Sequence, residues 1–251
     1  MTFLRECTIV FNRQLRMNLR NPAWVLIGVM QPVLYLVLFG PLLKPLTSQF
    51  GADNAYTFLV PGLLVQLGMF GAFFAGFSLI GEWREGVIEA ERVTPASRTA
   101  LLLGRLMRDV LQLLVQALIL VGLGYLMGLR GSFSGVILGI AITLLVGGAC
   151  AAASNALALT TKSEDVMAPV INMVMMPVLL LSGILLPMTL GPDWLQRLSD
   201  FMPFRWIVDA VRDTFAGEFD TSGVAWGSAW AVVLFGLAIW WGTAVFRKDN
   251  A

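Results

Sequence analysis

The charged residues best suited to chemistry lie together in one stretch, residues 81–105, of a mostly apolar chain. Arginine and glutamate side chains alternate there, and both form charge-assisted hydrogen bonds with a protein partner. The core of a bilayer would not tolerate them, since each charge costs a few kcal/mol there. We therefore expect a solvent-facing helix-turn-helix that receives force from a partner. Its charged side chains are Glu82, Arg84, Glu85, Glu89, Glu91, Arg92, Arg98 and Arg105.

The commonest general base and metal ligand, histidine, is missing from the sequence, so serine–histidine and HExxH sites are excluded. None of its lysines, Lys44, Lys162 and Lys248, follows a glycine-rich phosphate loop. The cysteines, Cys7 and Cys150, lack metal-type spacing. We therefore expect no catalytic residue, metal site or cofactor in this chain.

The composition predicts an all-α polytopic membrane protein. Hydrophobic residues make up 57% and charged residues 13% of the 251 positions, whereas an ordinary soluble domain has roughly 25% charged residues. Apolar runs long enough to span alternate with short connectors, which leaves room for about six transmembrane helices and no sizeable soluble domain. The net charge of +1 does not suggest nucleic acid as a partner.

The elements that would position the charged stretch form a single transmembrane domain over residues 1–251. Residues 1–22 carry apolar positions at helical spacing between arginines, which predicts an amino-terminal interfacial helix. A cleaved signal peptide is not expected, because the first apolar run is long enough to span. The predicted spans are residues 23–43, 56–80, 107–128, 136–159, 166–186 and 224–246.

The fourth and fifth predicted spans have unusual compositions. The middle of the fourth, GGACAAASNALA, is almost all small, which fits packing within the subunit, a subunit interface or the wall of a substrate path. In the fifth, Pro169 and Pro177 interrupt the backbone hydrogen bonds, and Asn172 lies between them. Such a helix is tolerated where protein or water covers the freed groups, so we expect it to line a cavity.

Residues 187–222 contain two amphipathic stripes that are too short and too charged to span. The polar face of the second stripe holds Arg205, Asp209, Arg212 and Asp213, of which Arg205 and Asp209 are four residues apart and able to pair. We expect two short extracellular re-entrant half-helices that dip into the membrane interface.

The distribution of positive charge predicts the orientation. Of the 17 lysines and arginines, most lie in the amino-terminal segment, the charged stretch, the turn at Lys162 and the carboxyl-terminal tail. By the positive-inside rule these segments face the cytoplasm. We expect a multi-pass protein of the bacterial cell (inner) membrane with both termini cytoplasmic.

Four short segments carry a resemblance to a known family: REGVIE at residues 84–89, RVTP at 92–95, SR at 97–98 and LLGR at 102–105. They resemble the signature of ABC-2 type transporter permeases, in the daunorubicin-resistance efflux branch. SGILLP at residues 182–187 is similar to the family's SGxxxP exit from the fifth span. The connector between the first two spans is short, which excludes a large outer domain.

The resemblance implies that residues 81–105 are the cytoplasmic coupling helix of a permease subunit, which docks on a separate cytoplasmic ABC ATPase subunit that binds ATP and Mg. It also implies a second permease copy or paralogue, and an extracellular gate made by the half-helices. The candidate coupling residues are Glu82, Arg84, Glu85, Glu89, Arg92, Thr94, Pro95, Ser97 and Arg98. Weaker candidates for the cargo path or gate are Asn172, Pro177, Ser182, Gly183, Pro187, Phe201 and Trp206.

Because the predicted spans are nearly free of charge, we expect a hydrophobic or amphiphilic cargo, drug or lipid-like, which is taken from the cytoplasm or the inner leaflet and exported. Membrane lipids are expected as partners of the spans. A polysaccharide or glycolipid exporter shares this architecture and stays an alternative. A second class is a non-transporting membrane anchor for a cytoplasmic partner, which would need neither a proline-broken span nor half-helices. A secondary carrier would predict inverted repeats and mid-span ionisable residues, and neither is evident.

Overall fold

A computed structural model describes residues 3–20, 23–45, 54–88 and 97–248. Within those ranges every regular element is a helix, which confirms the all-α prediction. Six helices, with α3 and α4 taken together, are long and apolar enough to cross a membrane. In chain order the elements are α1 (Phe3–Arg20), α2 (Ala23–Leu43), α3 (Ala55–Phe73), α4 (Ala75–Arg84), α6 (Arg98–Met127), α7 (Phe133–Thr161), α8 (Glu164–Leu181), η2 (Met188–Leu190), α9 (Asp193–Asp200), α10 (Pro203–Ala216) and α11 (Ser222–Lys248).

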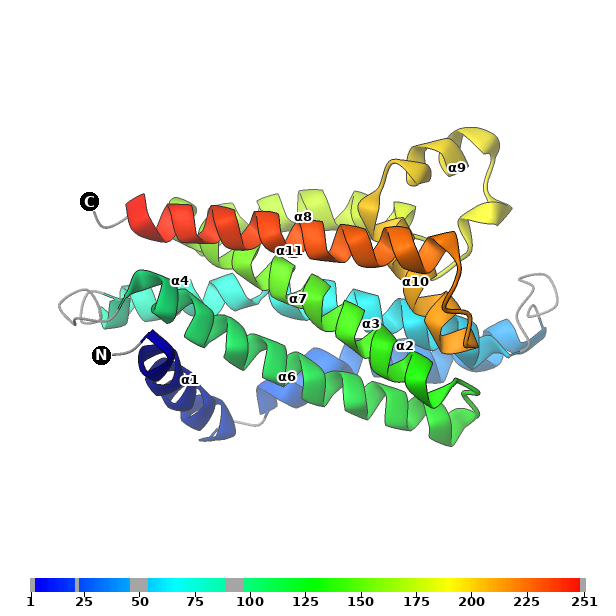
Figure 1. Cartoon of the computed structure of the whole chain (residues 1–251), viewed down its shortest axis with the longest axis horizontal. Coiled ribbons are helices and arrows are strands. Elements are labelled where there is room, and N and C mark those ends of the chain that lie inside the picture. The colour runs from blue at the N-terminus through cyan, green and yellow to red at the C-terminus, as the bar shows by residue number, and fades with distance from the viewer. Residues whose placement is uncertain (1–2, 21–22, 46–53, 89–96, 249–251) are drawn as a thin grey trace.

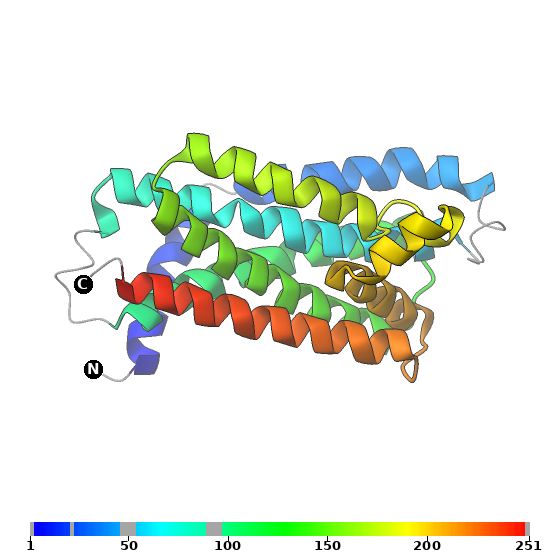
Figure 2. The same ribbon diagram turned by 90° about the horizontal axis from the view of Figure 1, so that it is seen from above.

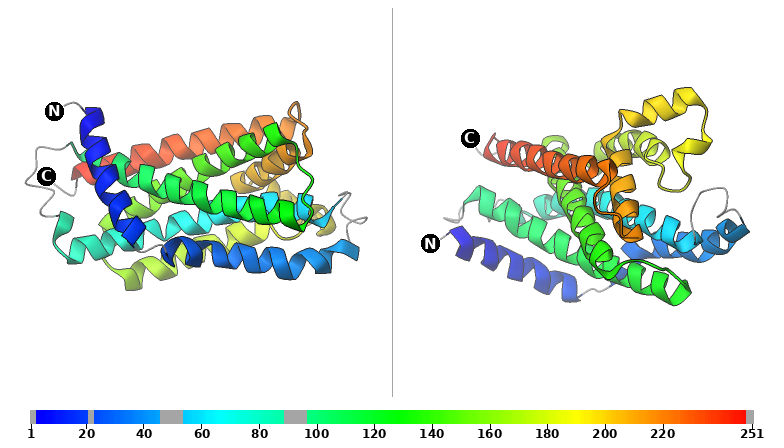
Figure 3. Two further views of the ribbon diagram at one scale, coloured as in Figure 1. Left: turned by 90° about the horizontal axis from the view of Figure 1, so that it is seen from below. Right: turned by 45° about the vertical axis from the view of Figure 1, so that its right-hand side comes forward.

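The long helices lie side by side in one elongated bundle (Figures 1 and 2). Helix α1 lies across one end of the bundle, at the same end as the carboxyl-terminal end of α11 (Figure 3). The short helices α9 and α10 lie at the opposite end (Figure 1). This arrangement agrees with an interfacial helix on one side and two half-helices on the other, while their depth in a bilayer stays a prediction.

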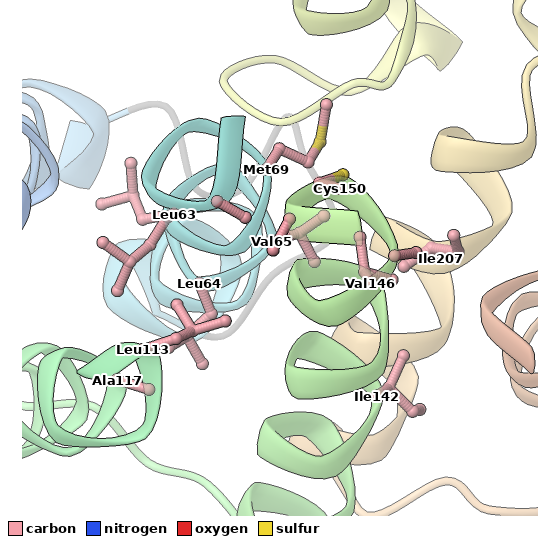
Figure 4. Packing of buried hydrophobic residues seen from close by; sticks show 14 of the residues in the cluster. Leu63, Leu64, Val65, Met69, Leu113, Ala117, Ile142, Val146, Cys150 and Ile207 are labelled. Atoms are coloured by element: carbon pink, nitrogen blue, oxygen red, sulfur yellow. The ribbon is translucent and has the colours of Figure 1, made fainter. Parts of the chain in front are cut away.

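Helix α7 is the centre of the bundle and packs against α3, α4, α6, α10 and α11. Its small residues make this possible: a Cβ at Gly147 would lie 2.2 Å from Leu113 Cδ2 of α6. Figure 4 shows Val146 of α7 among core side chains that include Val65 of α3 and Ile207 of α10. The run of small residues therefore serves packing within the subunit.

The predicted second span is broken into α3 and α4 at Phe74. Ser154 of α7 bridges the break, because its hydroxyl accepts a hydrogen bond from Gly76 N–H at 3.0 Å and donates one to the Phe73 carbonyl. A Cβ at Gly76 would lie 2.5 Å from the Ser154 carbonyl oxygen, so the two helices approach closely only because this residue is glycine. The break is thus stabilised by a long-range contact.

The charged connector is shorter than predicted, because both flanking helices extend into it. Helix α4 continues to Arg84, and α6 begins at Arg98, where the Ser97 hydroxyl accepts from Ala100 N–H at 3.3 Å as an N-cap. Directly after α4, Glu85 and Gly86 turn the chain, and Gly86 is in the left-handed region at φ 74°. Residues 89–96 lie outside the described part of the chain.

Candidate functional site

A buried ion pair joins the ends of α4 and α6 next to the charged connector. Arg105 Nη2 lies 2.7 Å from Glu82 Oε2, and Arg105 Nε donates to the same oxygen at 3.3 Å. Gln14 Nε2 of α1 donates to Glu82 Oε1 at 2.8 Å. Only 9% of Glu82 and 3% of Arg105 is exposed. The expectation that the whole stretch faces solvent is therefore wrong for these two residues, whose charges are compensated inside the protein.

The polar network continues along one face of α6. The Arg108 guanidinium donates to Gln14 Oε1 at 3.1 Å, to Ser78 Oγ at 3.4 Å and to Asp109 Oδ1. Together with the Glu82–Arg105 pair, these bonds connect α1, α4 and α6 through side chains alone. The three helices therefore form one polar unit at the end of the bundle that carries the connector.

Amide side chains extend this face further from the connector. Asn18 Nδ2 of α1 donates to Gln112 Oε1 at 2.8 Å, and Gln116 Nε2 donates to the Val25 carbonyl of α2 at 3.0 Å. The spacing of three or four residues between Arg105, Arg108, Gln112 and Gln116 places all of them on one side of α6. Sequence reasoning gave Asn18, Arg108, Gln112 and Gln116 no site role, although that spacing was visible.

A cavity of about 380 Å³ opens beside this network and the α3–α4 break. Its lining combines polar side chains of α1 and α6 with two phenylalanines that follow the break. Asp109 is one of the lining residues, and its Oδ2 is buried without a hydrogen-bond partner among the described residues. The residues that define the chemistry of the cavity are Asn18, Phe74, Phe77, Arg108, Asp109 and Gln116.

The structure describes some of the predicted coupling residues and not the others. Arg84 is exposed and forms a 3.0 Å ion pair with Glu164, at the start of α8, and Glu85 is exposed beside it. Ser97 donates its backbone N–H to Glu6 Oε2 of α1 at 2.9 Å, so its visible role is to start α6 and hold α1. Four candidates, and the side chain of a fifth, lie outside what the structure describes: Glu89, Arg92, Thr94 and Pro95, and the side chain of Arg98.

Two predicted gate residues lie in a second cluster, at the other end of the bundle. Arg212 of α10 donates to the carbonyls of Gly183 and Ile184, at 2.8 and 3.1 Å, and its guanidinium lies 3.9 Å from the ring centroid of Phe58. Gly183 has φ 70°, and Ser182 Oγ donates to the Leu179 carbonyl. Arg212 therefore fixes the turn after α8 to α10 and α3.

Burial lowers the pKa of Arg212 to about 10, and the nearby carboxylates of Asp209 and Asp213 oppose that shift. The side chain stays protonated at neutral pH and keeps its hydrogen bonds to the turn. On the same helix, Arg205 and Asp209 form the predicted ion pair, with an N–O distance of 3.7 Å. Sequence reasoning placed Arg212 on a polar face but did not identify it as a site residue, because its partners are 28 and 29 residues away.

The other predicted gate residues do not join this cluster. Trp206 Nε1 donates to the Asp200 carbonyl at 3.0 Å, and Phe201 is 86% exposed. Pro187 precedes η2 as its N-cap residue. Asn172 and Pro177 are on the exposed side of α8.

Residues 5–216 match the family of the ABC-2 type transporter. The chain is 27% identical over 217 residues to "Putative transport permease ycf38" of Pyropia yezoensis, in an alignment that covers 84% of this chain and 74% of the relative. It is 28% identical over 197 residues to the protein of the same name from Porphyra purpurea, covering 77% and 68% of the two chains. To "Probable multidrug ABC transporter permease YbhR" of Escherichia coli (strain K12) it is 24% identical over 210 residues, covering 76% of this chain and 54% of the relative.

Proposed function

Since the chain belongs to the ABC-2 type transporter family, we propose that it is the permease subunit of an ATP-driven exporter of a hydrophobic or amphiphilic cargo. Members of this family are membrane components of transport and are not themselves the ATPase. ATP and Mg would therefore bind to a separate cytoplasmic subunit. The similarity to a permease named as multidrug, and the resemblance of residues 84–105 to the daunorubicin-resistance branch, support a drug-like or lipid-like cargo.

The observation that carries this proposal is the buried Glu82–Arg105 pair, at 2.7 Å, on the two helices that flank the connector. A load applied to residues 85–97 reaches α4 and α6 together, because the pair and Gln14 hold their ends in one unit with α1. This is the construction a rigid lever requires. A membrane anchor needs no such connection between its connector and its spans.

The exposed part of the connector supplies the docking groups. Arg84 and Glu85 are both exposed, and the ion pair of Arg84 with the half-exposed Glu164 lies at the surface. The candidates Glu89, Arg92, Thr94, Pro95 and Arg98 follow in the sequence. We assign these residues to contact with the ATPase subunit, whereas Glu82 and Ser97 transmit the load inside the permease.

A second permease chain, a copy or a paralogue, would cover the exposed side of α8. Asn172 faces away from the protein in the middle of this apolar helix, and Pro169 and Pro177 on the same side leave backbone carbonyls without their usual helical donors. Exposure of such groups to lipid is costly. A partner subunit, a cargo path between two subunits, or both would remove that cost.

The cavity favours an amphiphilic cargo over the alternatives. It combines aromatic, amide and charged side chains within about 380 Å³, a size typical of sites for drug-sized molecules, roughly 300–1,000 Å³. A polysaccharide exporter would need a continuous path for a long chain. Transport would run from the cytoplasmic side outward in the cell (inner) membrane, with both chain termini cytoplasmic, as the distribution of lysine and arginine supports.

The experiment that tests this proposal is affinity purification of the tagged chain from its native host in mild detergent, with and without crosslinking, followed by mass spectrometry. We expect a stoichiometric ATP-binding protein and ATP hydrolysis by the complex. Recovery of this chain alone, after crosslinking as well, would contradict the exporter and favour a secondary carrier.

A further inference from the structure

Helix α1 is bound to the rest of the protein through one of its faces. On that face Val10 packs closely on α6, because a Cβ at Gly104 would lie 2.7 Å from the Val10 Cβ. Gln14 on the same face donates to Glu82 at 2.8 Å. The helix is thus fixed across the end of the bundle (Figure 3), and its other face, the outward face, is directed away from α6.

The outward face of α1 is basic. Arg5, Arg13 and Arg16 are all exposed, and their spacing of eight and three residues places them on one side of the helix. Glu6 is the only acidic residue of α1, and its carboxylate accepts from the Ser97 backbone N–H at 2.9 Å. The one carboxylate of the helix is therefore directed at the start of α6, and the outward face has an excess of positive charge.

We propose that the outward face of α1 binds anionic phospholipid headgroups, with the guanidinium groups of Arg5, Arg13 and Arg16 donating to phosphate oxygens. Arginine is suited to this contact, because its planar donors bind a phosphate in pairs. Clusters of basic residues at a membrane surface also attract anionic lipid. The proposal goes beyond the proposed transport function, because neither export nor the class of cargo requires an anionic lipid.

Apolar residues beside these arginines favour a lipid surface over a soluble partner. Ile9 lies between Arg5 and Arg16 in the sequence, Met17 and Leu19 follow them, and all three apolar side chains are exposed. A helix in the plane of the interface places its arginines among the headgroups and its apolar side chains at the acyl boundary. Helix α1 has the required orientation, since it crosses the bundle instead of running along it (Figure 3).

Binding of lipid to this face would also stabilise the contacts between α1, α4 and α6. Gln14 connects α1 to Glu82 of α4, and Glu6 connects it to Ser97 at the start of α6. A molecule that binds the folded protein and not the unfolded chain raises the free energy of unfolding. Anionic lipid should therefore raise the unfolding temperature, which provides a second measurement besides binding.

The binding test uses phosphatidylglycerol labelled with NBD on one acyl chain. Its control is phosphatidylcholine with the same label, which keeps the phosphate but has no net charge. Each probe is titrated with the full-length protein in dodecyl maltoside micelles and followed by fluorescence anisotropy. The titration is repeated at high salt, because raising the ionic strength from about 0.1 M to about 1 M shortens the Debye length from roughly 10 Å to roughly 3 Å.

The second measurement compares unfolding temperatures in phosphatidylcholine nanodiscs with and without phosphatidylglycerol. The variants for both measurements change exposed positions only. Arg5→Gln/Arg16→Gln removes two charges from the outward face, and Arg5→Lys/Arg16→Lys keeps them. Arg130→Gln/Arg197→Gln is the matched control, because both of its arginines are exposed and lie outside α1. Since none of the four arginines is buried, all three variants should fold.

We expect the unmodified protein and the control to bind phosphatidylglycerol at least tenfold more tightly than phosphatidylcholine, with a smaller preference at high salt. Arg5→Gln/Arg16→Gln should lose both this preference and the rise in unfolding temperature, whereas Arg5→Lys/Arg16→Lys should retain both. Equal binding of the two lipids by the unmodified protein would overturn the proposal, and so would an equal loss of preference in the control.

An unchanged lipid preference in Arg5→Gln/Arg16→Gln would overturn the proposal as well. If that variant also failed to co-purify the ATP-binding protein, the outward face would belong to the contact with the ATPase subunit. Because the lipid titrations contain no ATP and no second subunit, their failure would leave the co-purification test of the exporter unaffected.

Discussion

Glu82 Oε2 of α4 lies 2.7 Å from Arg105 Nη2 of α6, across the base of the connector that is most strongly charged in the sequence. Both side chains are almost fully buried, and Gln14 of α1 donates to the second carboxylate oxygen. The pair is therefore a structural joint between three helices, and its removal should affect stability before it affects any partner.

Glu82→Ala and Arg105→Ala should each destabilise the protein strongly, because removing one partner of a buried ion pair leaves the other charge uncompensated, at a cost of about 3–5 kcal/mol. The double variant Glu82→Leu/Arg105→Met should recover much of that loss, since no unpaired charge stays buried. Thermal unfolding in mild detergent, followed by tryptophan fluorescence, measures all three variants.

The exposed pair Arg84–Glu164 provides the control, because its side chains are 54% and 43% exposed and its N–O distance is 3.0 Å. Arg84→Ala and Glu164→Ala should each change the free energy of unfolding by no more than about 1 kcal/mol. If the double variant at Glu82 and Arg105 were as unstable as the worse single variant, the pair could not be the joint described above.

Gly76→Ala and Gly81→Ala, both in α4, should have opposite effects. A Cβ at Gly76 would lie 2.3 Å from Met167 Cε and 2.5 Å from the Ser154 carbonyl oxygen, whereas a Cβ at Gly81 meets nothing within 4 Å. Gly76→Ala should therefore lower the unfolding temperature. Gly81→Ala should raise it slightly, because alanine is better than glycine in a helix by up to about 1 kcal/mol.

Gly76→Ala, together with Ser154→Ala, also tests the break between α3 and α4. Ser154→Ala removes the hydroxyl that satisfies Gly76 N–H and the Phe73 carbonyl, and should cost about 1–3 kcal/mol by leaving buried groups unpaired. If Gly76→Ala and Ser154→Ala were both as stable as the unmodified protein, α7 would not hold the break.

The length of each apolar run was enough to predict six spans, because a helix of about 20 apolar residues fits the bilayer core. The break at Phe74 was not predictable, since no proline marks it and the hydroxyl that stabilises it belongs to Ser154, 78 residues from Gly76. Burial of Glu82 was missed for a similar reason: local sequence shows a charged stretch, whereas its partners Arg105 and Gln14 are 23 and 68 residues away. Charge alone predicts exposure unless the compensating residue is known.

The second cluster, around Arg212 and Gly183, could not be predicted from local sequence either. The left-handed turn at Gly183 could be expected from SGILLP, and the amphipathic stripe of α10 placed Arg212 on its polar face. Only the fold brings the two together, through the hydrogen bond from Arg212 to the Gly183 carbonyl at 2.8 Å. This turn also lies close against α3, and the approach is possible because residue 62 is glycine: a Cβ at Gly62 would lie 2.5 Å from the Ile184 carbonyl oxygen.

Arg212→Met should reduce transport by the assembled complex at least tenfold while the protein still inserts. The variant keeps an apolar stem over Phe58 but loses the donors to the Gly183 and Ile184 carbonyls, so α10 and the turn after α8 would no longer move together. Arg197→Met is the control, because Arg197 lies on the exposed side of α9. Equal transport by the two variants would show that the turn needs no connection to α10.

Single cysteines at Glu85 and Asp193 should react with a membrane-impermeant maleimide from opposite sides of the membrane. Both positions are exposed. Glu85 follows α4 and Asp193 begins α9, and these two helices lie at opposite ends of the bundle (Figure 1). In intact cells we expect labelling at position 193 and none at position 85 until the membrane is made permeable. Labelling of both from one side would contradict the topology, and a reversed pattern would contradict the cytoplasmic position of the connector.

Glu89→Ala/Arg92→Ala should uncouple the permease from its ATPase without preventing insertion. Charge-assisted hydrogen bonds contribute about 1.5–3 kcal/mol each, so the loss of both side chains should weaken association with the ATPase subunit at least tenfold. The measurement is the amount of ATPase that co-purifies, together with export by intact cells.

The control for this variant is Arg197→Ala/Glu218→Ala, which removes the same two charges from exposed positions at the other end of the bundle. It should leave association and export unchanged, since neither residue is near the connector. Unchanged export by Glu89→Ala/Arg92→Ala would refute the assignment of these residues to coupling. Normal association with lost export would instead mean that the pair transmits force after docking, through the joint made by Glu82 and Arg105.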